Sequence, residues 1–207
     1  MRSSNDRKTK TSVRLNRYLA QCGIGSRRKC DELIASGHIF CNGERVTAMG
    51  LRINADSDRI EYHGKAVKVV QGLRYFALYK PREVMVTAND PQGRTTVYDL
   101  LVKAGYDSGN LRYVGRLDYQ SEGLLLITSD GDLVHALTHP RYKIKKVYQV
   151  KAGRKLLTED IQALLEGIVS NGQLLRAGAI RELSSPEPGR KQFWYEIDLF
   201  EGKNRQC

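Results

Sequence analysis

The apolar residues of this chain occur in short runs, and the longest purely aliphatic one is Leu124-Leu125-Leu126-Ile127. A helix that crosses a membrane needs roughly 20 consecutive apolar residues. We therefore expect a soluble protein with no membrane partner, and the mean hydropathy of -0.47 agrees with this expectation. Residues 1–10 are polar and basic with no apolar stretch behind them, so we expect no secretory signal and a cytoplasmic location.

The chain carries a strong positive charge. Its 207 residues include 34 Lys and Arg against 23 Asp and Glu, which gives a formal net charge of +11. Such a field attracts polyanions, so charge favours nucleic acid as the partner, while a basic solvated surface remains the alternative. A metal site is not indicated, because the four cysteines form no Cys-x-x-Cys pair and Pro140 directly follows the His135/His139 pair.

The N-terminal part of the chain predicts a tail and a small domain. Residues 1–11 contain too few apolar groups to offset the entropy of ordering them, so we expect a flexible basic tail. Residues 12–60 predict two short helices followed by strands. Ser26 is a suitable N-cap for the second helix, and Asn42-Gly43 is a strong signal for a type I′ hairpin turn.

Three cations occupy the first turn of that second helix, namely Arg27, Arg28 and Lys29. Each opposes the helix dipole there, at a cost of about 0.3 to 1 kcal/mol. A phosphate backbone bound at this helix end would reverse the sign of the interaction. These residues are therefore candidates for nucleic-acid binding, with a solvated charge run as the alternative.

The rest of the chain predicts a second, α+β domain. Residues 61–72 are expected to be a linker and residues 73–207 the domain itself. Short helices alternate there with strand-like segments, which favours a mixed or antiparallel sheet. The strongest strand signals are Leu73–Tyr79, Leu111–Val114, Leu124–Thr128, Val147–Ala152 and Phe193–Phe200.

A polar loop bounded by Gly115 and Gly123 lies between two of these strands and contains one central carboxylate, Asp118. A loop held at both ends by strands is a rigid platform that can direct a carboxylate towards a ligand. From spacing alone, a surface ion pair between Arg116 and Asp118 is the favoured interpretation, because Asp and Ser are common turn residues.

Two longer stretches resemble known families. The stretch from Arg14 to Arg28, with Leu33-Ile34-Ala-Ser-Gly37 and Asn42-Gly43, resembles the S4 RNA-binding module. Gly115-Arg-Leu-Asp118, continued by Ser121-Glu-Gly-Leu-Leu-Leu-Ile-Thr and Asp130-Gly131, is similar to the catalytic segment of the S4-containing pseudouridine synthases that act on ribosomal RNA. The supporting motifs of that family are matched in order by Lys80-Pro81, Lys146-Val-Tyr148 and Glu201-Gly-Lys203-Asn-Arg205-Gln206.

This resemblance implies an α+β protein in which an S4-like domain precedes a synthase domain that isomerises uridine to pseudouridine. Asp118 is then the catalytic carboxylate, as nucleophile or base, Tyr148 stacks on the uracil, and Lys203 is the cation that keeps Asp118 ionised. The reaction involves no redox step or phosphate transfer, so no cofactor is expected. The expected RNA-binding residues are Arg116, Arg205, Arg14, Arg17, Ser26, Arg27, Arg28 and Lys29.

The sequence departs from the family at two places. Glu83 stands where the family motif usually has glycine, and the chain stops at Cys207, inside the third motif, so we expect a synthase domain that is incomplete at its C-terminus. A non-catalytic RNA-binding protein with an incomplete synthase domain is therefore the alternative. Asn89–Arg94 and Asn204-Arg205-Gln206 resemble the large-subunit branch, which implies large-subunit ribosomal RNA as the substrate of a monomeric enzyme.

Overall fold

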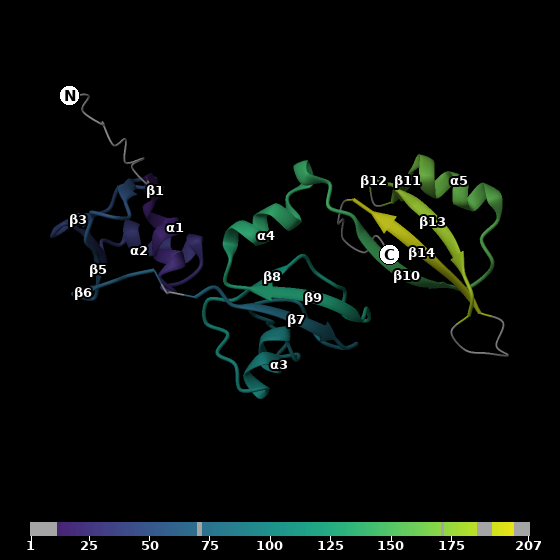
Figure 1. Ribbon diagram of the computed structural model, residues 1–207, viewed down its shortest axis with the longest axis horizontal. Helices are drawn as coiled ribbons and strands as arrows, with labels where there is room; N and C mark the ends of the chain where they lie inside the picture. Colours follow the sequence, from purple (N-terminus) through teal and green to yellow (C-terminus); the bar gives the residue numbers. More distant parts are fainter. Residues whose placement is uncertain (1–11, 70–71, 171, 186–191, 201–207) are drawn as a thin grey trace, which may run out of the picture.

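The computed structural model describes residues 12–69, 72–170, 172–185 and 192–200. It has the expected α+β content, and every strand ladder in the described part of the chain is antiparallel. Figure 1 shows three successive groups of elements: an N-terminal domain, a central sheet with its helices, and a second sheet at the C-terminal side.

The N-terminal domain packs two helices against short strands. Its core holds Leu15, Leu19, Cys30 and Ile34 from the helices, together with strand residues such as Ile60. Strands β3, β2, β5 and β6 form one sheet in that order, and β1 pairs with β4. The elements are β1 (Ser12–Arg14), α1 (Leu15–Gln21), α2 (Arg27–Ala35), β2 (Ile39–Cys41), β3 (Glu44–Val46), β4 (Arg52–Asn54), β5 (Ile60–Tyr62) and β6 (Lys65–Ala66).

Local sequence signals explain the ends of these elements. The Ser26 side chain accepts a hydrogen bond from the Lys29 backbone N–H, so Ser26 is the N-cap of α2, as predicted. Asn42 and Gly43 have φ values of 53° and 85°, and they connect β2 to β3 where Cys41 faces Glu44. These positive values are the ones that a type I′ turn requires.

Residues 61–72, which we expected to be a linker, begin with regular structure. Strand β5 extends to Tyr62, and β6 pairs with it, so these residues belong to the sheet of the first domain. The Tyr18 hydroxyl also donates to the Val67 backbone oxygen at 3.2 Å. Within the range that we expected to be a linker, Tyr62 and Val67 therefore pack against the core of the first domain.

The central part contains a three-stranded sheet, here called the β9 sheet, in the order β7, β9, β8. Leu125 and Ile127 of β9 are buried, whereas Leu124 and Leu126 face the other side and are exposed. Helix α3 covers the buried face through Val97 and Leu101 (Figure 1). The elements are β7 (Tyr75–Lys80), α3 (Val97–Lys103), β8 (Arg112–Val114), β9 (Gly123–Thr128) and α4 (Gly131–Thr138).

The C-terminal part contains a second three-stranded sheet, here called the β10 sheet, in the order β10, β14, β13. Tyr195 of β14 is almost fully buried, and its hydroxyl accepts a hydrogen bond from the Leu156 backbone N–H. The elements are a 3-10 helix (Pro140–Tyr142), β10 (Lys146–Ala152), α5 (Thr158–Glu166), β11 (Ile168–Ser170), β12 (Gln173–Leu175), β13 (Ala179–Leu183) and β14 (Phe193–Leu199). Among the described residues, no helix has the length and apolar character needed to cross a membrane.

Candidate active site and basic surfaces

The loop of residues 115–122 joins β8 to β9, whose register pairs Val114 with Leu126. Gly115 has a φ of 74°, a left-handed conformation that suits glycine, and it turns the chain out of β8. Leu117 packs against the core beneath the sheet, while Arg116 and Asp118 on either side of it are exposed. The anchored leucine therefore leaves the Asp118 carboxylate facing solvent.

Lys80 fixes this loop from below. Its side chain is fully buried, at 0% exposed, and its Nζ donates to the backbone oxygens of Ser121 at 2.7 Å, Pro81 at 2.9 Å and Tyr119 at 3.4 Å. An ammonium has three donors, so the three carbonyls satisfy it fully. Burial lowers the pKa of Lys80, and the nearby charges of Asp118 and Glu122 act in the opposite direction.

The chain that follows Lys80 also holds the loop. The Glu83 backbone N–H donates to the Tyr119 oxygen at 2.7 Å, and the Arg82 side chain lies 3.6 Å from the Glu122 carboxylate. Glu83 has a φ of 62°. This left-handed conformation costs an L-residue about 1 kcal/mol or more, which explains in physical terms why glycine suits the position.

A second ion pair braces the loop from the side. The Arg94 guanidinium donates to both oxygens of Asp90, at 3.1 and 2.7 Å, and lies over the Tyr119 ring at 5.6 Å from its centroid. These hydrogen bonds from Arg94 hold the pKa of Asp90 at about 2. The segment resembling the large-subunit branch thus contacts the loop that carries Asp118.

The other predicted catalytic residues do not meet Asp118 in the described part of the chain. Tyr148 is half-buried on β10, opposite Ile197 of β14, and so belongs to the β10 sheet rather than the β9 sheet. Lys203 and Arg205 lie outside the described residues. The structure therefore places Asp118 on a loop of the β9 sheet and Tyr148, the predicted stacking residue, in the β10 sheet.

The basic residues of the first domain surround a crevice of about 360 Å³ that Arg14, Arg17, Arg27 and Arg52 line. Arg14 and Arg52 face each other directly in the β1–β4 ladder. Like charges in this position are unfavourable unless an anion lies between them. Arg52 was not predicted from the sequence, because only the register of β1 against β4 brings it beside Arg14.

The remaining predicted cations differ in their environments. Arg17 donates to the Asp132 carboxylate at 2.7 Å, which connects the first domain to the start of α4. Lys29 pairs with Glu32 at 3.1 Å on α2. Ser26, Arg27 and Arg28 are exposed, so the start of α2 is accessible to a polyanion.

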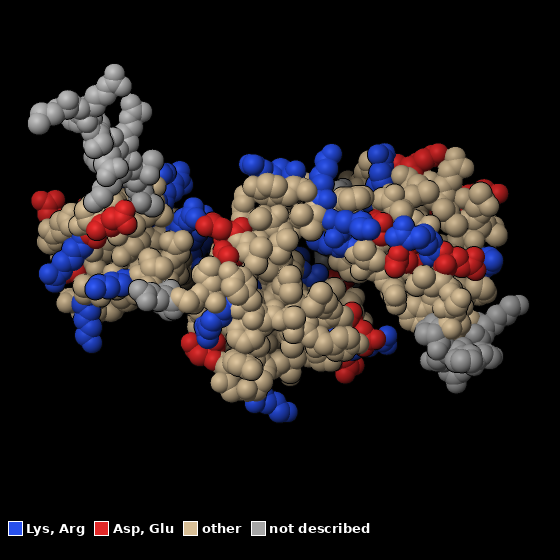
Figure 2. All heavy atoms as spheres, viewed as in Figure 1, with Lys and Arg blue, Asp and Glu red and all other residues tan. Residues whose placement is uncertain are grey.

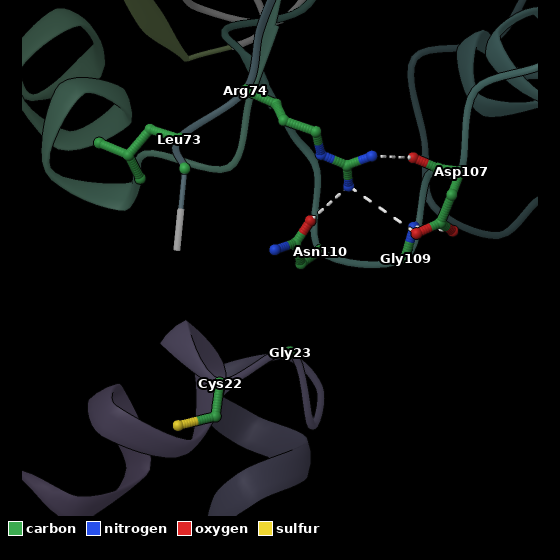
Figure 3. A pocket seen from close by; sticks show the side chains of 8 residues that line it. Cys22, Gly23, Leu73, Arg74, Asp107, Gly109 and Asn110 are labelled. Carbon is green, nitrogen blue, oxygen red and sulfur yellow. Dashed lines mark hydrogen bonds and ion pairs between the residues drawn. The ribbon is translucent and has the colours of Figure 1, made fainter. Parts of the chain in front are cut away.

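A wider crevice of about 680 Å³ separates Cys22 and Gly23 of the first domain from the start of the second (Figure 3). Arg74 crosses one wall of this crevice and donates to the Asp107 oxygen at 2.8 Å and to the Asn110 side chain at 2.6 Å. These bonds use two of the five N–H donors of the Arg74 guanidinium, and they attach the 107–110 loop to the residue that precedes β7. Of the predicted catalytic residues that the structure describes, neither Asp118 nor Tyr148 lines the crevice.

We predict that Lys80→Met lowers the free energy of unfolding by about 2 to 4 kcal/mol, because it leaves buried carbonyls without a donor. Urea unfolding of the whole chain measures this loss. Lys103→Met, at an exposed position on α3, is the matched control and is expected to change stability by less than about 0.5 kcal/mol. Equal effects of the two substitutions would contradict the anchoring role of Lys80.

We also predict that the stability contributed by Asp90 depends on pH. The folded pKa of about 2 lies below the ordinary 3.8, so the contribution is present above pH 4 and is lost as the pH falls towards 2. The stability difference between the native chain and Asp90→Asn should therefore shrink over this interval in urea unfolding. A difference that stays constant from pH 6 to pH 2.5 would contradict the prediction.

Comparison with known proteins agrees with this division of the chain. Residues 13–60 match the S4 domain, and residues 74–207 match the RNA pseudouridylate synthase family. A crystal structure of a pseudouridylate synthase is similar, with a TM-score of 0.56 and 24% identity, over 94% of this chain and 80% of that chain. At that level of identity the likeness shows the fold alone.

Several relatives are more similar in sequence. Ribosomal large subunit pseudouridine synthase B of Bacillus subtilis is 37% identical over 93% of this chain and 77% of its own length. The protein of the same name from Pseudomonas aeruginosa is 33% identical over 93% of this chain and 50% of its own length, and an uncharacterized RNA pseudouridine synthase of Aquifex aeolicus is 38% identical over 75% and 61%. The chain therefore belongs to the RNA pseudouridylate synthase family.

Proposed function

We propose that this protein isomerises a uridine of large-subunit ribosomal RNA to pseudouridine. The observation that carries the proposal is the exposed carboxylate of Asp118 on a loop that a buried lysine holds in place. The names of the Bacillus and Pseudomonas relatives support the large ribosomal subunit as the source of the substrate. The proposed enzyme acts as a monomer in the cytoplasm, and light scattering tests the monomeric state.

The proposed reaction rearranges bonds within one nucleotide. The C1′–N1 bond breaks, the uracil rotates, and a C1′–C5 bond forms, while C5 loses a proton and N1 gains one. Asp118 acts as nucleophile or base in this sequence, and Lys203 keeps it ionised. Tyr148 provides a ring on which the extruded uracil stacks. This assignment requires the β9 and β10 sheets to contribute to one site.

The RNA itself is held by the first domain in this proposal. The arginines that line the crevice at β1, α1 and α2 bind phosphates, and the accessible start of α2 adds the backbone N–H groups of a helix end. Phosphate contacts of this kind position an RNA without reading its sequence. The choice of uridine is therefore left to contacts near Asp118 and Tyr148.

We predict that Asp118→Asn abolishes pseudouridine formation while RNA binding persists. Tyr148→Phe keeps the stacking ring and should still bind RNA, but turnover should collapse because the phenol helps to remove the C5 proton. Chemical mapping of pseudouridine in both ribosomal RNAs after incubation with each variant measures the outcome. Glu159→Gln, at an exposed position of α5, is the control and should retain full activity.

Two results of that mapping would oppose the proposal. RNA that is bound but never modified by the native chain would favour the alternative of a non-catalytic RNA-binding protein. Modification of small-subunit RNA, with every large-subunit site unchanged, would reject the assignment to the large subunit.

We further predict that Arg27→Ala combined with Arg28→Ala weakens RNA binding and flattens its salt dependence. For a duplex, each lost phosphate contact reduces the slope of log K against log salt by about 0.9. A salt titration with a ribosomal stem-loop measures the slope, and thermal unfolding checks that stability is retained. An unchanged slope would show that the start of α2 does not contact the RNA.

A further inference from the structure

Residues 135–146, here called the bridge segment, join the two sheets of the second domain. The segment contains the end of α4, the 3-10 helix Pro140–Tyr142, and the chain that enters β10. Figure 1 shows it passing from the β9 sheet to the β10 sheet. Tyr148, the proposed stacking residue, lies on β10 only two residues after the end of the bridge segment. The segment and Tyr148 are therefore neighbours in sequence.

Three aromatic rings of the bridge segment form a cluster. The ring centroids of His135 and His139 are 4.8 Å apart, and the Tyr142 ring lies edge-on to both, at 6.0 and 6.2 Å. The Arg141 guanidinium covers Tyr142 at 4.6 Å from the ring centroid. Tyr142 is 43% exposed, so part of a positioned aromatic ring faces solvent.

The backbone keeps this cluster in place. The His139 Nδ1 accepts a hydrogen bond from the Arg141 backbone N–H, and Pro140 begins the 3-10 helix. Lys143 then adopts a left-handed conformation with a φ of 47°, which turns the chain away from the rings. A ring held in this way loses little conformational entropy when a planar group stacks on it.

The same segment is strongly basic. Arg141, Lys143, Lys145 and Lys146 fall within six positions that contain no acidic residue. In the described part of the chain, Lys145 alone among these four has a carboxylate partner, Asp198 at 3.3 Å. Figure 2 shows Lys and Arg side chains gathered over the junction between α4 and the β10 sheet. The segment therefore presents cations whose charge is available to a ligand.

Stacking rings interleaved with cations distinguish this surface from a simple charged patch. Exposed cations alone would suit any polyanion, and exposed apolar groups alone would suit a protein. Each nucleotide of a single strand offers the π-face of its base to Tyr142 and a backbone phosphate to a neighbouring cation. Single-stranded nucleic acid therefore matches both the ring and the cations. A duplex cannot, because its bases are already stacked on one another.

We propose that the bridge segment binds unpaired nucleotides next to the target uridine, with one base on the Tyr142 ring and phosphates on Arg141 and Lys143. This inference rests on the proposed function for the identity of the RNA. It adds a binding surface distinct from the loop of Asp118 and from the arginine crevice of the first domain.

Fluorescence anisotropy with a labelled 12-nucleotide oligouridylate tests the proposal, with a 12-base-pair RNA duplex as the comparison probe. Tyr142→Ala should weaken oligouridylate binding about tenfold, a size expected for the loss of one stacked base. Tyr142→Phe keeps the ring and should bind within twofold of the native chain. Neither substitution should alter duplex binding. Tyr79→Ala, at an exposed tyrosine of β7, is the matched control and should have no effect on either probe.

The charge part of the proposal is tested separately. Arg141→Ala combined with Lys143→Ala should lower the slope of log K against log salt for oligouridylate by about 0.7 per cation, whereas Lys103→Ala should leave it unchanged. Photocrosslinking of an oligouridylate that contains one 4-thiouridine should label a peptide within residues 135–146. This labelling does not depend on any substitution being tolerated by the fold.

Three outcomes would overturn the inference. Tyr142→Ala could lower the affinities for oligouridylate and duplex equally, or all bridge variants could bind oligouridylate within twofold of the native affinity. Crosslinks found only outside residues 135–146 would be the third. A poly-glutamate probe that binds equally well and responds equally to Tyr142→Ala would assign the surface to acidic proteins instead. These measurements read binding alone, so they remain informative if no pseudouridine is formed and the proposed function itself fails.

Discussion

The buried ammonium of Lys80 is the interaction on which the arrangement of the candidate site depends. A charged group inside a protein is costly unless its donors are all satisfied, and here three backbone oxygens accept them. Two of these oxygens belong to the loop of residues 115–122. The requirement to satisfy one cation therefore fixes the loop, and the loop in turn positions Asp118 at the surface.

The neighbouring segment adds independent restraints on the same loop. Glu83 and Arg94 contact Tyr119 from two directions, through a backbone hydrogen bond and through a guanidinium over the ring. Asp90 holds Arg94 in place with two hydrogen bonds. A carboxylate supported in this way is presented in a fixed geometry although it lies on a loop, which is the property that a catalytic group needs.

Local signals predicted much of the fold. Ser26 caps α2, Asn42-Gly43 forms the β2–β3 turn, and the aliphatic run at Leu124–Ile127 lies in a strand, because each signal acts within a few residues. The α+β class and the family resemblance are confirmed. The pairing of β6 with β5 could not be predicted from local signals, since it depends on the sheet already formed by β2 and β5.

The contacts that surround the candidate site were harder to predict from the sequence. The position of Asp118 followed from its motif, but the anchoring role of Lys80 depends on Lys80 facing Gly123 across the β7–β9 ladder. Arg52 joins the basic crevice through a similar long-range register. Sequence patterns do not specify strand registers over such separations. The loop of Asp118 belongs to the β9 sheet, whereas Tyr148 lies in the β10 sheet. This separation depends on which strands pair, and no motif specifies that pairing.

The complete burial of Lys80 also has a chemical consequence. Acylating reagents modify an amine only when it is accessible and unprotonated, and Lys80 is 0% exposed in the folded chain. Its amine reacts only during moments when the carbonyls of Ser121 and Tyr119 move away, that is, when the loop opens locally. The rate at which Lys80 is labelled, relative to the rate for the exposed Lys103, therefore reports how often the loop that carries Asp118 opens.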